Sequence, residues 1–355
     1  MSLIVRQELP FNAETSPEAL ARSWITASRD FYVRSHATIP EIAAPAYRLA
    51  VRGLVEMPLA LSLADLRGAF ASHETTALLQ CAGNRRDGHT RVERIADDVP
   101  WEAGALGNAA WRGVRLAEIL ARAGVRPGAR HVEFIGLDAC ATKAGETAFG
   151  ASIPIEKALH PETLIALEMN GEPLPPEHGF PARSLVPGFI GARSVKWLAT
   201  IVVKDRPSDN YFQARSYKVF PPDVNAKSVA WESVEPIGEC PINSAICVPA
   251  PGAAVAVGAA RVRGYAMAPG VAGRRVARVE VSANGGATWT DAALASPNVP
   301  FSWCLWEATL DLRAGPATLV CRATDSAGAA QPERVEWNFK GYLYNAWHRV
   351  PVTAR

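Results

Sequence analysis

The sequence has little excess charge and no long apolar run. None of its uninterrupted apolar stretches approaches the roughly 20 residues that a membrane-crossing helix needs. Its net charge is only +2, and no run concentrates lysine and arginine, which argues against nucleic acid or a membrane surface as a partner. The first 15 residues contain neither an apolar signal core nor a twin-arginine pair. We therefore expect a cytoplasmic protein, or a periplasmic one if a leader has been removed.

Closely paired cysteines are also missing. The six cysteines are dispersed along the chain at positions 81, 140, 240, 247, 304 and 321. They form no CxxC pair, no His/Cys zinc pattern and no CxxCH haem-attachment motif. Because disulfides are rare in a reducing compartment, we expect the five cysteines after Cys81 to be core or surface thiols.

Cys81 itself has an unusual setting. An apolar run leads into it from Leu78, and a small-residue turn with two arginines follows it as far as Arg86. A cation beside a thiol favours the thiolate, which is the form that attacks electrophiles and binds soft metals. Free cysteines are also among the most buried residues and often act as small hydrophobes. The local pattern alone therefore leaves a chemical and a structural role equally open.

The length and composition predict two globular domains. A chain of 355 residues with 48% hydrophobic and 20% charged residues exceeds one ordinary domain and can fill two cores. In the first part, helix and strand signals mix without regular alternation, which favours the α+β class. Capping and spacing predict helices over 18–28, after Ser16-Pro17, over 62–70, and over 116–123 with a stop at Gly124. Strands are expected at 48–51, 75–79 and 132–135.

The last third of the sequence has a different character. Short strand-like runs separated by turn residues predict an immunoglobulin-like β-sandwich. The expected strands are 253–257, 261–267, 276–282, 288–294, 301–312, 318–323 and 334–339, and Asn284-Gly285 marks a hairpin turn. The stretch 206–246 is rich in proline and is expected to be irregular. We accordingly expect one domain at 1–235 and a second at 236–355.

The string CAGNRR at 81–86 resembles the molybdenum-ligating loop of the sulfite oxidase family. Similar segments follow one another in the family's order along most of the chain. They are 31–36, 100–101, 107–111, 151–154, 168–175, 178–183, 187–197, 216–218, 284–286 and 345–349. The resemblance implies a mixed α+β molybdopterin domain of the sulfite oxidase type, followed by an immunoglobulin-like dimerisation domain and hence a homodimer.

The resemblance also implies a reaction and a cofactor. The reaction would be oxidation of sulfite to sulfate by oxygen-atom transfer at a molybdenum centre. No side chain both accepts two electrons and transfers an oxygen atom, so a cofactor must supply that step. The implied cofactor is molybdenum held by a single molybdopterin, with Cys81 as the protein's metal ligand. No haem is expected, so the electrons would pass to oxygen or to a separate redox protein.

Matching positions assign roles to individual residues. The resemblance implies that Cys81, Tyr217 and Arg34 are catalytic. It implies that the substrate is bound by Arg34, Arg86, Trp101, Tyr217 and Lys340, which offer cationic forks and directional donors to an oxyanion. It implies that the cofactor and its phosphate are held by His36, Cys81, His178, Arg183, Ser194 and Lys196. Trp111 is expected to be plain core, and Arg85 has no assigned role.

The chain departs from the family pattern at two positions. Ser216 stands where an acidic residue is common, and Lys340 stands where an arginine is expected. A lysine offers a point charge instead of a fork, which would weaken sulfite binding. An alternative is a nitrate-reductase-like molybdenum enzyme that acts on another oxyanion or an S-oxide, although Tyr217 argues against it. A non-catalytic module should show damage at Cys81, Arg34 or the pterin loops, and no such damage is visible.

Overall fold

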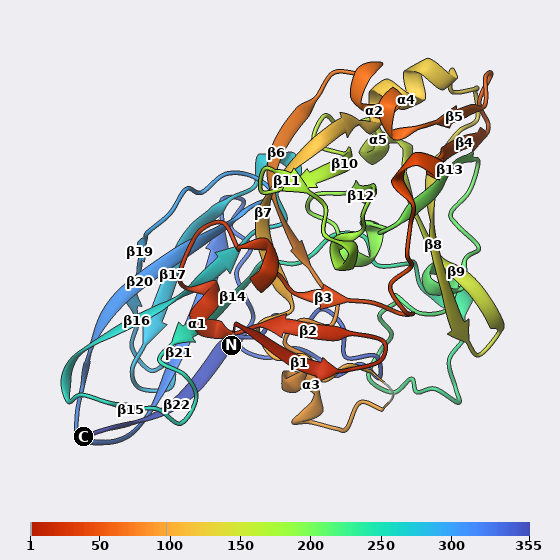
Figure 1. The fold of residues 1–355 in the computed structure, drawn as a ribbon. Coiled ribbons are helices and arrows are strands. Elements are labelled where there is room, and N and C mark those ends of the chain that lie inside the picture. Colours follow the sequence, from red (N-terminus) through yellow and green to blue (C-terminus); the bar gives the residue numbers. More distant parts are fainter. Residues whose placement is uncertain (1, 97) are drawn as a thin grey trace.

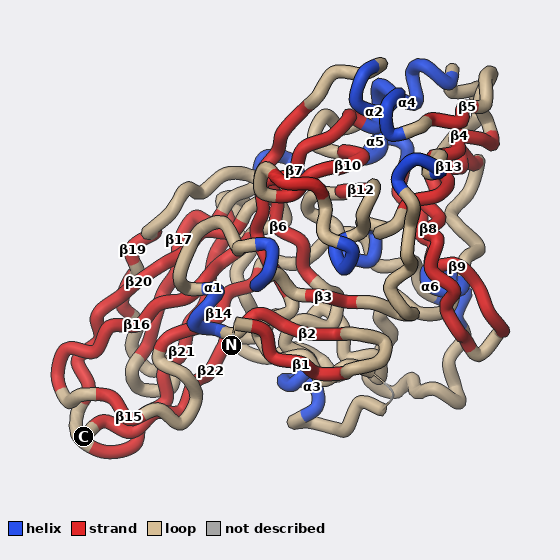
Figure 2. The backbone as a smooth tube through the Cα atoms, in the orientation of Figure 1, coloured by secondary structure: helices blue, strands red, loops and turns tan. Residues whose placement is uncertain are grey.

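The computed structural model describes residues 2–96 and 98–355, in a mixed N-terminal region and a C-terminal region of strands (Figure 1). Strands dominate both regions, and the few helices are short (Figure 2). The α-helices are α1 (Pro17–Leu20), α2 (Leu63–Gly68), α3 (Asp87–Thr90), α4 (Leu116–Ala123), α5 (Ile155–Ala158) and α6 (Tyr211–Ala214). Within the described residues, no helix is long and apolar enough to cross a membrane.

Three sheets build the N-terminal region. The first is antiparallel and contains β1 (Leu3–Gln7), β2 (Asn12–Thr15) and β3 (Val33–Arg34). The second has the order β11 (Glu172–Pro173), β10 (Leu164–Met169), β7 (Leu106–Arg115) and β6 (His73–Gln80), with β12 (Arg183–Leu185) also on β10. The third has the order β5 (Leu59–Leu61), β4 (Leu49–Gly53), β13 (Leu198–Lys204), β8 (His131–Thr142) and β9 (Gly145–Pro154). Since only β4 and β13 pair in parallel, the class is α+β, as the sequence predicts.

Two sheets form the C-terminal sandwich. One has the order β14 (Asn243–Val248), β16 (Gly258–Met267), β20 (Trp303–Leu312) and β19 (Ala293–Leu294). The other has the order β15 (Ala254–Val255), β22 (His348–Ala354), β21 (Gly315–Asp325), β17 (Val276–Ser282) and β18 (Thr290–Asp291). Buried side chains from both sheets, among them Val262, Trp306 and Leu319, form the core between them. The sandwich expected from the sequence is present.

Local signals correctly predicted the beginning of α2 and the end of α4, but they misplaced the end of α1. The side chain of Ser62 accepts from the Asp65 N–H and the Asp65 carboxylate accepts from the Ser62 N–H, so the expected capping box opens α2. Gly124, with a φ of 68°, ends α4 as expected. The helix expected as far as residue 28 was wrong, because α1 ends at Leu20. Beyond the end of this helix, Trp24 and Trp303 each donate an indole N–H to the other's carbonyl.

Two expectations in the C-terminal region were also wrong. The segment 334–339 is a loop, in which the side chain of Asn338 donates to and accepts from the backbone of Tyr342. The missing strand is β22, which pairs with β21 beyond the last expected strand. In addition, β14 lies partly within the stretch 206–246 that was expected to be irregular, where it gains the neighbouring strand β16. Long-range pairing therefore decided the structure at both places.

Arg85 joins the two regions. Its backbone has a φ of 63°, in the left-handed range that non-glycine residues rarely adopt. The buried guanidinium donates to the Asn243 side chain at 2.7 Å and to the Ser244 carbonyl at 3.1 Å, both on β14. The ring of Tyr344 lies 5.2 Å from its guanidinium carbon. The residue that had no role in the sequence analysis therefore anchors the Cys81 turn to the sandwich.

Replacing Arg85 with methionine should lower the free energy of unfolding by about 3 kcal/mol, because two hydrogen bonds from a buried charge are lost. Arg91→Met is the matched control, since the Arg91 side chain is exposed and forms an ion pair with Asp87 that contributes at most about 0.5 kcal/mol. Urea unfolding curves of the two variants and the wild type measure the difference. Equal losses in both variants would contradict the anchoring role.

Candidate active site

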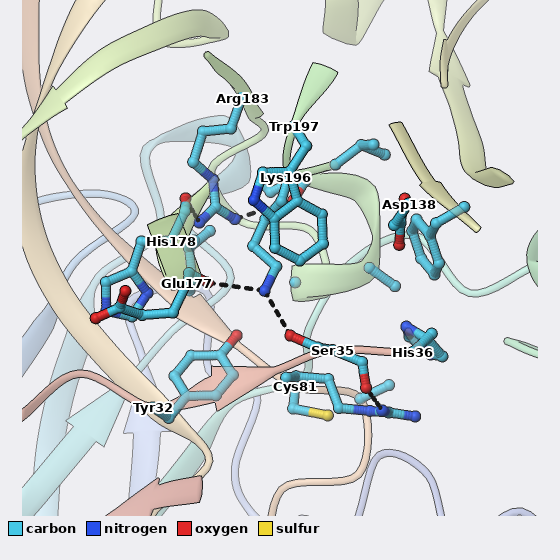
Figure 3. A pocket seen from close by; sticks show the side chains of 18 of the residues that line it. Tyr32, Ser35, His36, Cys81, Asp138, Glu177, His178, Arg183, Lys196 and Trp197 are labelled. Carbon is cyan, nitrogen blue, oxygen red and sulfur yellow. Dashed lines mark hydrogen bonds between the residues drawn. The ribbon is translucent and has the colours of Figure 1, made fainter. Parts of the chain in front are cut away.

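A cavity in the N-terminal region brings together most of the predicted site residues (Figure 3). It encloses about 660 Å³ of empty space, part of it open to solvent. Eight of the eleven predicted residues line it, namely Arg34, His36, Cys81, His178, Arg183, Ser194, Lys196 and Tyr217. The other three, Arg86, Trp101 and Lys340, do not line this cavity. The structure thus separates the residues that line this cavity from a second group of predicted side chains.

Cys81 lies directly after β6, where the sheet ends and the chain turns. Its N–H donates to the Ala105 carbonyl at 2.9 Å, and the Asn84 side chain accepts from the Ala105 N–H at 3.0 Å. Gly83 leaves room in this turn for the Arg86 guanidinium, which folds back over it. A Cβ at Gly83 would lie only 2.6 Å from the guanidinium carbon. The turn therefore fixes the Cys81 thiol at the cavity wall by backbone contacts.

The segment from Arg34, the last residue of the short strand β3, to His36 lines the same cavity as Cys81. The fully buried side-chain oxygen of Asn12, on β2, accepts from the Ser35 N–H at 2.8 Å and from the Arg34 guanidinium at 3.2 Å. Burial opposes the charge of Arg34, but its pKa lies above its ordinary value because the ionisable groups of Tyr217 and Cys81 lie nearby. Asn12 was not among the predicted residues, since its role depends on pairing between β2 and β3.

Two cations in the cavity wall have no carboxylate partner among the described residues. Lys196 donates to the Ser35 hydroxyl at 3.0 Å and to the Glu177 carbonyl at 2.8 Å. Arg183 donates to the carbonyls of His178 and Ser194, each at 2.9 Å. Burial lowers the pKa of Arg183 to about 10, and burial together with the charge of Arg183 lowers the pKa of Lys196. The cavity therefore carries positive charge that an anionic ligand would stabilise.

His178 and Asp138 add polar atoms to the same wall. His178 Nε2 donates to the Ser28 carbonyl at 3.0 Å, and burial lowers its pKa to about 3, so the ring is neutral with Nδ1 as an acceptor. Asp138 lies on β8 and accepts from the Cys140 thiol at 3.3 Å through one oxygen. Its other oxygen is buried with no partner in the described part of the chain. Asp138 was not predicted, and no local motif in the sequence marks it.

Tyr217 and His36 form a hydrogen-bonded pair. The phenol oxygen lies 2.9 Å from His36 Nε2, and the His36 ring stacks on Phe149 with centroids 4.7 Å apart. Burial raises the pKa of Tyr217, and burial with the nearby charge of Arg34 lowers the pKa of His36. Both groups are therefore neutral near pH 7, so the phenol retains its proton.

Arg86, Lys340 and Trp101 lie together beside the cavity. The Lys340 ammonium donates to the Asp98 carboxylate at 2.8 Å, and the other carboxylate oxygen lies 3.7 Å from Arg86 Nη2. The Lys340 charge also contributes to the lowered pKa of His36, behind burial and closer cations. Trp101 is fully buried in the same apolar cluster as Cys81, and its indole N–H has no partner among the described atoms. Trp111, expected as core, is buried and donates to the Ala77 carbonyl.

These residues fit a molybdenum–molybdopterin group on chemical grounds. A thiol at the cavity wall suits a soft metal, and two cationic side chains that form no ion pair among the described residues suit a phosphate. The unpartnered oxygen of Asp138 and Nδ1 of His178 offer acceptors to the N–H groups of a pterin. A small residue is needed at Gly191, where a Cβ would lie 2.6 Å from the Tyr32 hydroxyl. The donors, acceptors and thiol therefore match the three chemically distinct parts of such a group.

Comparison with known proteins agrees with this chemistry. A family model described as an oxidoreductase molybdopterin binding domain matches residues 36–212, and a model described as a Mo-co oxidoreductase dimerisation domain matches residues 234–355. The solved structure of the sulfane dehydrogenase SoxCD from Paracoccus pantotrophus is similar, with a TM-score of 0.83 and 26% identity. That match covers 99% of this chain and 86% of the other. The chain is therefore an oxidoreductase of the molybdopterin-binding class.

Curated relatives narrow this class. The chain is 44% identical to sulfite oxidase from Gallus gallus, over 98% of this chain and 77% of that protein. It is 40% identical to sulfite oxidase from Arabidopsis thaliana, over 98% of this chain and 93% of that protein. The chain belongs to the sulfite oxidase family. It spans 65 to 66% of the length of the mouse and human mitochondrial sulfite oxidases that it matches.

Replacing Lys196 with methionine should reduce the molybdenum and pterin bound per purified chain to about a tenth of the wild-type amount. The reason is that a charge-assisted bond to the phosphate is lost, which lowers affinity about tenfold or more. Elemental analysis and pterin fluorescence measure the content. Lys143→Met, at the exposed turn between β8 and β9, is the control and should retain full content. Full content in the Lys196 variant would remove this residue from the cofactor site.

Proposed function

We propose that this protein oxidises sulfite to sulfate by oxygen-atom transfer, with a molybdenum–molybdopterin group ligated by Cys81. The observation that carries the proposal is the convergence of the Cys81 thiol, the Arg34 guanidinium and the Tyr217 phenol on one cavity. When bound, the group would supply the two-electron oxidation and oxygen transfer that side chains cannot perform. His36, His178, Arg183, Ser194 and Lys196 are the residues that we propose to hold it.

The protein's own residues would bind and orient the oxyanion. Arg34 stays charged and presents forked donors, and Arg86 and Lys340 add positive charge beside it. The Tyr217 phenol keeps its proton and can donate it in a hydrogen bond to a substrate oxygen. Trp101 contributes an unpartnered N–H on an apolar wall. Because that wall is buried and apolar, these interactions act at a low local dielectric.

The alternative is reduction or oxidation of another oxyanion or an S-oxide, as in nitrate reductase. Tyr217 supports sulfite, since the matching position in nitrate reductases is usually asparagine. The departure at Lys340 is neutral between the two reactions. Assays of the same preparation with sulfite and with nitrate distinguish them, and we propose sulfite as the substrate that is turned over.

The oligomeric state, the electron acceptor and the location of the protein are also proposals. We propose a homodimer formed through the C-terminal sandwich, with the domain boundary between residues 235 and 236. The 355 residues contain no CxxCH motif, and we propose that no haem takes part and that electrons pass to oxygen or a separate redox protein. A cytoplasmic location, without nucleic-acid or membrane partners, is consistent with the balanced charge.

Replacing Cys81 with serine should abolish sulfite-dependent reduction of ferricyanide, because the hydroxyl does not replace the thiolate as a ligand for a soft metal. Wild-type protein made in a cofactor-competent host should contain about one molybdenum per chain, as one thiolate site implies. Cys304→Ala is the control, since it removes a buried thiol of β20 in the sandwich. Activity that survives in the Cys81 variant would refute the proposed function.

Replacing Lys340 with arginine should lower the KM for sulfite about threefold, because a guanidinium fork holds an oxyanion better than an ammonium. The maximal rate should change little, as the chemistry does not pass through this residue. Initial-rate kinetics at saturating acceptor give both constants. Lys227→Arg, at an exposed position, should leave them unchanged. An unchanged KM in the Lys340 variant would place this residue outside the substrate pocket.

A further inference from the structure

A second cavity adjoins the first and is lined by the carboxylate residue Asp98. Arg34 and His36 line both cavities, so the two cavities share these two side chains. Arg6 and Pro100 also line it, and Pro100 precedes the substrate-site candidate Trp101. A small anion that reaches Arg34 through this second cavity therefore meets Asp98 on its way.

Asp98 pairs with Lys340 and Arg86, the two other cations predicted to bind the substrate. One carboxylate oxygen accepts from the Lys340 ammonium at 2.8 Å, and the other lies 3.7 Å from Arg86 Nη2. The Asp98 side chain is only 10% exposed, and the Arg86 side chain only 3%. Water therefore screens the carboxylate and the guanidinium weakly, and the three groups act as one charged cluster.

The remaining nitrogens of Arg86 are already engaged. Nη1 donates to the Val99 carbonyl, and Nε donates to the Lys340 carbonyl at 3.3 Å. Only Nη2 faces away from these backbone acceptors, and it faces Asp98. An oxyanion that binds Arg86 or Lys340 must therefore share their donors with a resident carboxylate.

We propose that Asp98 is a specificity-determining residue, which competes with the bound oxyanion and discriminates against dianions. This inference rests on the proposed function and adds to it a basis for product release. Repulsion by a fixed negative charge doubles when the charge of the ligand doubles. Sulfate is a dianion near neutral pH, whereas sulfite is partly the monoanion hydrogensulfite. Asp98 therefore weakens the binding of the product more than the binding of the substrate.

The test is Asp98→Asn in the holoenzyme. Asparagine preserves the shape and one acceptor oxygen but removes the charge. The inhibition constant for sulfate should fall about tenfold and the KM for sulfite about threefold, since the dianion loses more repulsion. Glu102→Gln is the matched control, because it removes an equal charge from an exposed side chain that pairs with Arg6. It should change both constants less than about twofold.

An unchanged or larger inhibition constant for sulfate in Asp98→Asn would overturn the inference. Equal decreases in the inhibition constant for sulfate and in the KM for sulfite would also overturn it, because they would show that Asp98 weakens the binding of both ligands to the same extent. Molybdenum content verifies that the variant is folded and loaded, and Asp98→Ser provides a second neutral side chain if the asparagine variant is not.

Calorimetric titration of the holoenzyme with inorganic sulfate separates this inference from the proposed function. If the wild type fails to oxidise sulfite but Asp98→Asn binds sulfate more tightly, the proposed function is wrong, and the oxyanion competition stands. If the wild type oxidises sulfite and Asp98→Asn binds sulfate no more tightly than wild type, the competition is wrong, and the function stands.

Discussion

The structure depends above all on holding two cations inside a cavity wall without a carboxylate partner. Arg183 and Lys196 are bonded only to carbonyl and hydroxyl oxygens among the described residues. Neutral acceptors position a cation without cancelling its charge, so the cavity keeps its affinity for an anion. Arg183 links the segments around His178 and Ser194, and Lys196 links its own segment to Ser35 and Glu177.

The charges are arranged differently around Arg86 and Lys340, where we propose that the substrate binds. There, Arg86 and Lys340 share the carboxylate of Asp98, and the surplus of positive charge is smaller. The two ends of the site thus match two kinds of ligand. A cofactor that stays bound suits uncompensated cations, whereas a substrate that must leave as product suits cations with a resident competitor. Lys340 offers a point charge where the forked guanidinium of an arginine was expected. Like Asp98, it therefore weakens the binding of an oxyanion.

Sequence patterns predicted the features whose causes are local. The capping box at Ser62, the stop at Gly124 and the cysteine turn at 81–86 each depend on neighbours within a few residues. They did not predict Asp98, because its partner Lys340 lies 242 residues away in the chain. Asn12 and Asp138 were missed for the same reason. The strand expected at 334–339 was wrong because the Asn338 side chain binds the Tyr342 backbone and holds a loop there instead.

The opposite directions of two consecutive arginines limit how this chain can evolve. Arg85 reaches into β14 of the sandwich, while Arg86 folds over Gly83 toward Asp98. Because the backbone of Arg85 is left-handed, the side chains of Arg85 and Arg86 point in different directions. An insertion or deletion of a single residue in 81–86 would change the directions in which these two side chains point, and it would move Cys81 as well. The length of this turn is therefore constrained as tightly as its side chains.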